Sequence, residues 1–151
     1  MYRYERGIHM IRAFNEKDLD TVVKIWLDTN IQSHSFISKN YWKENLDMVR
    51  DILPEAEIYV YIDEMTREIE GFIGLTGNHI AGLFVRESAQ SNGIGRLLVR
   101  HVKKIKKSLS LNVYSKNERA VRFYQQENFL IYSGNVDVHT KEQEYYMIWN
   151  K

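Results

Sequence analysis

The chain of 151 residues contains no cysteine and only one proline. Without a thiol it forms no disulfide, no thiolate zinc site and no cysteine nucleophile. No apolar run approaches the ~20 residues that a membrane-spanning helix needs. An excess of one charge is also missing, because 21 Lys and Arg residues stand against 20 Asp and Glu residues. We therefore expect a cytoplasmic protein whose partners include neither a membrane nor a nucleic acid.

What is present is an ordinary globular composition, with 44% hydrophobic and 27% charged residues. This composition argues against disorder, and the length suits a single domain with a substantial core. The sequence shows no linker-like stretch and no internal repeat. Residues 1–9 lack the positive-then-apolar pattern of a signal peptide. We expect them to be a flexible extension in front of one domain over residues 10–151.

Hydrophobic spacing predicts an alternation of strands and helices along the chain. Asn15 is expected to cap a first helix that runs to about residue 31, and Ser38 to cap a second helix that Pro54 ends. The strands are expected at residues 10–14, 58–62, 69–76, 80–85, 109–114, 129–138 and 145–149, and two later helices at 94–105 and 117–127. The order β-α-α-β-β-β-α-β-α-β-β predicts an α/β protein with a mixed sheet and helices packed on its faces.

A glycine-containing segment, Gln90-Ser91-Asn92-Gly93-Ile94-Gly95, lies between a predicted buried strand and a basic helix. Glycine lets the backbone approach a phosphate, and the free N–H groups at a helix start supply an anion site. A tight strand-to-helix turn accounts for the same glycines equally well. Position 98 is leucine, so the third glycine of the Rossmann pattern is missing, as is the Gly-Lys-Ser/Thr of P-loop NTPases.

This segment resembles the Gln-x-x-Gly-x-Gly motif of the GNAT acetyltransferases. A second family signature is similar to residues 117–124, Asn-Glu-Arg-Ala-Val-Arg-Phe-Tyr, followed by Asn128-Phe129. Further likeness to the YjaB-like bacterial branch extends over residues 10–150, in the segments 34–37, 53–56, 77–79 and 83–85. Two departures from the family pattern are Arg86-Glu87 and Asn128, and asparagine tolerates the left-handed backbone that glycine has there.

The resemblance implies acetyl-CoA as the cofactor and no metal. The pantetheine arm is then expected between the strand that ends at Val85 and the strand at 109–114, with a backbone N–H near Val85 stabilising the oxyanion of the thioester. The cofactor-binding residues implied by the resemblance are Leu83, Phe84, Val85, Gln90, Ser91, Asn92, Gly93, Ile94, Gly95, Arg96 and Asn117.

Direct acetyl transfer needs an uncharged amine and a proton for the departing thiolate. Tyr124 occupies the family position of the acid, and a phenol with a reference pKa near ~10 is still protonated when a thiolate forms. His79 stands eleven residues before Gln90, where relatives place a base, and histidine is mostly neutral at pH 7. The structural alternatives are a tyrosine packed in a helix and a histidine bonded to backbone.

His34 lies in the loop after the first helix, which borders the acceptor pocket in this family. It is expected to bind substrate or to assist as a base, and a solvated loop histidine is the alternative. Phe36, Tyr41 and Trp42 are expected to wall the same pocket, and the alternative for aromatics at helical spacing is packing in the core. The five histidines include no pair at helical i, i+4 spacing, so the sequence gives little support to a metal site.

The expected function is acetyl transfer from acetyl-CoA to a primary amine of a small molecule or peptide, by direct attack in a ternary complex. The alternative is a coenzyme-A-binding sensor without turnover. A third class, nucleic-acid binding through the lysines at 103–107, is disfavoured because no aromatic residues interleave with them. The terminal hairpin leaves monomer and homodimer open.

Overall fold

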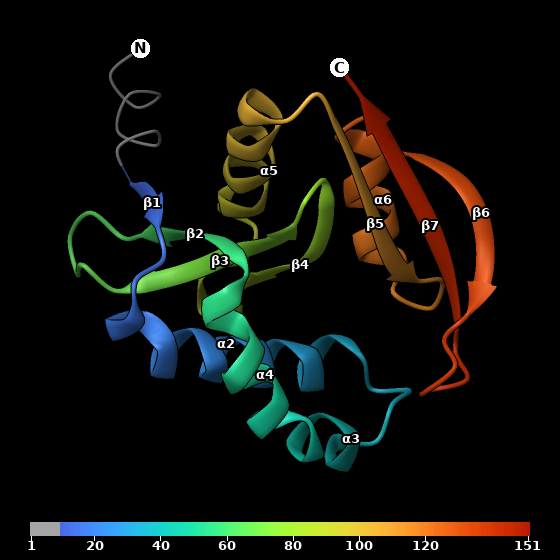
Figure 1. Cartoon of the computed structure of the whole chain (residues 1–151), viewed down its shortest axis with the longest axis horizontal. Helices are drawn as coiled ribbons and strands as arrows, with labels where there is room; N and C mark the ends of the chain where they lie inside the picture. The colour runs from blue at the N-terminus through green and yellow to red at the C-terminus, as the bar shows by residue number, and fades with distance from the viewer. Residues whose placement is uncertain (1–9) are drawn as a thin grey trace.

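Residues 10–151 are described by the computed structural model, and they form one seven-stranded sheet with helices on both faces (Figure 1). The strand order is β1-β2-β3-β4-β5-β7-β6. Neighbouring strands are antiparallel except β4 and β5, which are parallel. The α/β class with a mixed sheet is thus confirmed, while the expectation for residues 1–9 lies outside the described residues.

The strands are β1 Ile11–Ala13, β2 Glu57–Ile62, β3 Ile69–Thr76, β4 His79–Val85, β5 Ser108–Tyr114, β6 Leu130–Val136 and β7 Gln143–Asn150. The helices are α2 Leu19–Ser33, α3 Lys39–Glu44, α4 Leu46–Ile52, α5 Ile94–Ile105 and α6 Glu118–Gln126, with short 3-10 turns η1 Glu16–Asp18, η2 Leu53–Glu55 and η3 Glu87–Ala89. Among the described helices, none has the length and apolar character that crossing a bilayer requires. Nor do three or more His, Asp or Glu side chains of residues 10–151 gather as a metal would need.

The first helical segment begins with a capping box. The Asn15 side chain accepts from the N–H of Lys17 at 3.1 Å, and the Asp18 carboxylate accepts from the N–H of Asn15 at 3.0 Å. These bonds satisfy N–H groups that have no partner inside a helix, so the predicted role of Asn15 is confirmed. The turn leads directly into α2, which buries Val22, Val23 and Ile25.

The prediction of one helix between Ser38 and Pro54 is wrong, because the chain forms two helices there, α3 and α4, with a break at Asn45. The Asn45 side chain donates to the carbonyl of Tyr41 at 2.6 Å, and its own N–H bonds to Trp42 at 3.2 Å. Asparagine competes in this way for backbone groups and interrupts helices. The predicted cap is confirmed, since Ser38 Oγ accepts from the N–H of Asn40 at 3.2 Å.

Two apolar cores lie on opposite faces of the sheet. One is formed by α2 and α4 against β2 and β3, and the other by α5 and α6 against β3, β4, β5 and β7. Figure 1 shows α2 and α4 on one side of β2 to β4 and α5 on the other. The helices on the two faces therefore enclose β2 to β4 from both sides.

The sheet separates in its middle, between β4 and β5. These strands pair only at His79 with Ser110 and at Ile80 with Leu111. The pairing of β3 with β4 shifts register between Gly74 and Leu75, which leaves Ala81 as the extra residue of a bulge. A bulge bends its strand. In Figure 1, β5, β7 and β6 accordingly run steeply across the direction of β2 and β3.

Candidate active site

A cavity of about 360 Å³ lies beside the separated part of β4, between the end of α2 and the starts of α5 and α6. Most of the predicted site residues meet in its wall. Those in the wall are His34, Leu83, Phe84, Val85, Gln90, Ser91, Gly93, Ile94, Gly95, Arg96, Asn117 and Tyr124. Asn92, Phe36 and His79 are predicted site residues that do not line it.

The loop from Gln90 to Gly95 has the backbone of an anion site. Ser91 (φ 68°) and Gly93 (φ 81°) both adopt the left-handed conformation. Gly93 is the N-cap of α5, and no side chain caps that helix end. The first N–H groups of α5 therefore remain free to bind a negatively charged group, helped by the helix dipole. A Cβ at Gly95 would make ordinary van der Waals contact with the Phe123 ring at 3.4 Å, so the left-handed Gly93 is the glycine that the backbone requires. The loop thus fits the diphosphate of coenzyme A.

Gln90 ties the loop to its neighbours. Its side-chain amide donates to the carbonyl of Val85 at 2.9 Å, which fixes the end of β4. Its oxygen accepts from Arg119 Nη1 at 3.3 Å, and Arg119 Nη2 donates to Ser91 Oγ at 3.1 Å. Arg119 comes from the first turn of α6 and lines the cavity. No sequence signal singled out Arg119, although it stands two residues after Asn117.

Arg96 lines the cavity and also pairs with an acidic residue outside it. Its Nε lies 3.6 Å from the carboxylate of Glu127, which is only 5% exposed, and Arg100 Nε lies 3.5 Å from the same group. Lys103 donates to the Glu127 carbonyl. A buried carboxylate needs such cations. The α5 cations therefore fasten this helix to the end of α6.

Tyr124 combines burial with access to the cavity. The residue is 8% exposed and its ring packs between Phe123 and Phe129, at centroid distances of 5.2 and 5.7 Å. Burial raises the pKa of Tyr124 above the usual value of a phenol. The side chain therefore stays protonated near neutral pH and can act there only as a proton donor.

His34 is a neutral group in the cavity wall. Asn117 Oδ1 accepts from the N–H of Ala120 at 3.3 Å, which directs the Asn117 amide nitrogen to His34 Nε2 at 3.4 Å. The ring is then an acceptor at Nε2 and carries its proton on Nδ1, an assignment that follows from this network. Burial lowers the pKa of His34 to about 4. Nδ1 is buried without a hydrogen-bond partner among residues 10–151.

His79 lies outside the cavity wall, next to the point where β4 and β5 separate. Its Nδ1 is 2.8 Å from Ser110 Oγ on β5, and its ring stacks on Tyr146 of β7 at 6.4 Å. No other residue of the described chain is hydrogen-bonded to its second ring nitrogen. Burial lowers the pKa of His79, so the ring is neutral at pH 7.

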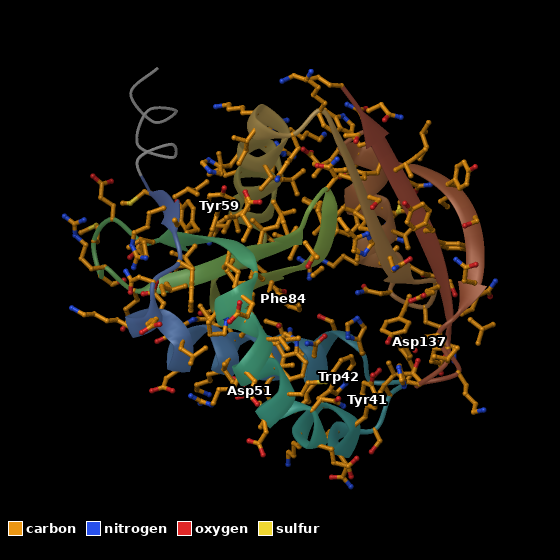
Figure 2. All side chains as sticks on the ribbon, in the orientation of Figure 1. Tyr41, Trp42, Asp51, Tyr59, Phe84 and Asp137 are labelled. Carbon is orange, nitrogen blue, oxygen red and sulfur yellow. The ribbon has the colours of Figure 1, made fainter. Side chains whose placement is uncertain are left out.

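Beyond His34 stands an aromatic cluster formed by Phe36, Tyr41, Trp42 and Tyr114. His34 lies 5.6 Å from Phe36, 5.4 Å from Trp42 and 5.1 Å from Tyr114 between ring centres. Tyr114 donates its hydroxyl to Asp137 at 2.7 Å. In Figure 2, Tyr41 and Trp42 on α3 face the turn between β6 and β7 that carries Asp137. Aromatic faces beside a carboxylate suit a cationic ligand.

Burial, together with the nearby charge of Asp137, raises the pKa of Tyr41 and of Glu144. Both groups therefore sense the same negative charge at this end of the molecule. A positively charged ligand placed among them would relieve that repulsion. The sequence analysis had no signal for Asp137, because it lies on a hairpin turn far along the chain from α3.

Comparisons with known proteins agree with this geometry. The family description "Acetyltransferase (GNAT) domain" matches residues 54–130, which include the loop and Tyr124. The peptidyl-lysine N-acetyltransferase YiaC of Escherichia coli is 32% identical over 142 residues, covering 93% of this chain and 96% of its own. The peptidyl-lysine N-acetyltransferase YjaB of the same organism is 35% identical over 121 residues, covering 80% and 82%. The solution structure of apo-form YjaB from Escherichia coli has a TM-score of 0.82 at 31% identity, covering 92% of this chain and 95% of that one.

Proposed function

This chain belongs to the GNAT family of acetyltransferases, and we propose that its acceptor is the side-chain amine of a lysine in a peptide or protein. The chain is an acetyl-CoA-dependent N-acetyltransferase, as the sequence predicts. The observation that carries the proposed acceptor is the aromatic cluster with Asp137, which stands next to His34 in the wall of the cofactor cavity. The printed names of the two relatives support it.

The cavity is the proposed cofactor side, and the aromatic cluster with Asp137 beyond His34 is the proposed acceptor side. On the cofactor side, the N–H groups at the start of α5 hold the diphosphate, and the backbone of Leu83 to Val85 holds the pantetheine arm as an added strand. This backbone is free on its β5 side because the pairing of β4 with β5 stops at Ile80. Asn117, kept in place by His34 Nε2, borders the same arm.

Acetyl-CoA supplies an activated acetyl group when bound, and the chain's own residues manage the protons. Tyr124 gives its phenolic proton to the departing sulfur, and the last proton lost by the attacking nitrogen restores the phenol. His79, neutral at pH 7, accepts the proton of the acceptor amine at the nitrogen that Ser110 leaves free, directly or through water. His34 is too weak a base for this task near neutral pH, because its pKa is about 4.

A lysine side chain suits the acceptor side for electrostatic reasons. Its ammonium has a reference pKa near ~10.4 and arrives charged, so it is attracted by Asp137 and by the aromatic faces. Its four-carbon stem packs along apolar surface while the head stays polar. The aromatic faces and Asp137 are thus suited to capture of the cation before its proton is removed.

The test is an acetylation assay on purified protein with peptides that carry one lysine and a blocked N-terminus. We expect a mass increase on the lysine, and no increase when lysine is replaced by arginine. Tyr124→Phe should lower kcat by ~10²-fold and leave the affinity for acetyl-CoA unchanged, because only the proton donor is lost. Transfer only to polyamines or aminoglycosides would exclude lysine as the acceptor and leave the family assignment intact.

A further inference from the structure

Two cations line the cofactor cavity, and they differ in their partners. Arg96 is paired with the buried Glu127 carboxylate at 3.6 Å. Arg119 has no carboxylate within ion-pair distance among residues 10–151, and its two terminal nitrogens contact the neutral oxygens of Gln90 and Ser91 at 3.3 and 3.1 Å. Both bonds already have a charged donor, and an anionic acceptor would add the Coulomb attraction of two opposite charges and allow a bidentate pair. The Arg119 guanidinium therefore gains when an anion replaces these acceptors.

Arg119 lies beside the loop at Gln90 to Gly95, so an anion bound at that loop is within reach of its guanidinium. Gln90 and Ser91 belong to the loop whose left-handed residues lead into the uncapped start of α5, a helix of 12 residues. Arg119 reaches this loop from α6 and lines the same cavity. A diphosphate held by the N–H groups of the loop would therefore lie within reach of its guanidinium. The planar fork of arginine also matches two phosphate oxygens at once.

We propose that Arg119 binds the diphosphate of coenzyme A and clamps it from α6 against the loop at Gln90 to Gly95. Its contacts with Gln90 and Ser91 hold the guanidinium in the place where the phosphates bind. Arg96, by contrast, serves the contact between α5 and Glu127. The inference rests on acetyl-CoA as the cofactor and is independent of the acceptor.

The experiment compares the affinities of coenzyme A, 3′-dephospho-coenzyme A and pantetheine for four proteins, by calorimetric titration without an acceptor. The proteins are the natural chain, Arg119→Gln, Arg119→Lys and the matched control Arg122→Gln. Arg122 is an exposed cation on the same helix, outside the cavity wall.

We expect Arg119→Gln to weaken both phosphorylated ligands by ~10- to 100-fold and to leave pantetheine unchanged. Arg119→Lys should recover only part of the loss, because it keeps the charge without the fork. Arg122→Gln should stay within about 2-fold of the natural chain, since its charge is screened by salt.

Three results would overturn the proposal. An equal loss for Arg119→Gln and Arg122→Gln would reduce the effect to general charge. A loss of affinity that extends to pantetheine would mean that Arg119 stabilises the loop and does not bind the diphosphate. A loss for coenzyme A that is absent for the dephospho form would assign the contact to the 3′-phosphate. Because no acceptor is present, failure of the lysine assay affects none of these readings.

Discussion

Two histidines of the same intrinsic basicity acquire different roles from their surroundings. His34 is enclosed by aromatic rings and bonded to Asn117, and burial lowers its pKa to about 4. His79 lies at the sheet surface against Ser110 and Tyr146, with a smaller lowering of its pKa. The proposed roles differ accordingly, with positioning for His34 and proton transfer for His79. The sequence alone offered both as bases, because desolvation is a property of the folded chain.

His34 should make the protein less stable in acid. Its pKa is about 4 when folded and ~6.5 when unfolded, so the unfolded state binds more protons between these values. Stability from this group is therefore complete above pH 6.5 and is lost as the pH falls. Urea unfolding at pH 7 and pH 4.5 should show a loss of about 2–3 kcal/mol that is missing in His34→Gln. An identical pH dependence in the variant would contradict the assignment.

His79 should define the acid limb of the rate profile. Because burial lowers its pKa, the ring loses its base function only below pH ~6.5. We expect kcat/KM of His79→Gln to be ~10²-fold lower near pH 7, with the limb removed. His101→Gln is the matched control, since His101 is also half-buried, has a lowered pKa and packs on Tyr59 at 4.7 Å. If the acid limb of the kcat/KM profile survives in His79→Gln, another residue is the base.

At the scale of elements, the loop from Gln90 to Gly95 is a strand-to-helix connection that leaves the first N–H groups of α5 unpaired. Its left-handed residues and the missing side-chain cap of α5 are backbone features. The pattern of glycines predicted the loop, whereas the left-handed Ser91 had no sequence signal. The break between α3 and α4 was also hidden, because apolar residues keep helical spacing across Asn45.

Gly93→Val and Gly77→Val form a matched pair that tests the loop. Both glycines have positive φ, 81° and 61°, and a Cβ at either would meet no atom within 4 Å. Both variants should lose similar stability from backbone strain, on the order of 1–2 kcal/mol. Acetyl-CoA at a hundred times its Kd should raise Tm by roughly 5–10 °C in the natural chain and in Gly77→Val. Gly93→Val should show no rise, and an undiminished rise would remove the loop from the cofactor site.

At the scale of the whole molecule, the sheet consists of two halves joined by little pairing. One half contains β1 to β4 and the other contains β5, β7 and β6, and only two residue pairs of the described chain link β4 to β5. The cavity residues come from the end of α2, from β4, from the loop and start of α5, and from α6 with Asn117 before it. A cofactor bound along β4 therefore lies beside this gap in hydrogen bonding, while one apolar core still joins the two halves.

Acetyl-CoA should slow amide hydrogen exchange in a pattern that follows this gap. We expect added protection at residues 82–85, 91–97 and 117–120, where free backbone groups face the cavity or the ligand stabilises a helix start. The β1–β2 pair should change little, because it lies at the far edge of the sheet. Uniform protection of all strands, or none near 82–85, would contradict binding in the gap.

The sequence by itself determined the element types, the mixed sheet and the family, because these follow from local periodicity and from two short motifs. It also predicted the loop and Tyr124 as site residues, because each belongs to a short local motif, and both line the cavity. The tertiary structure alone decided that His34 is neutral, that Arg96 pairs with Glu127 and that Arg119 and Asp137 border the site. Burial and long-range pairing depend on which segments meet in space, and no local pattern records that.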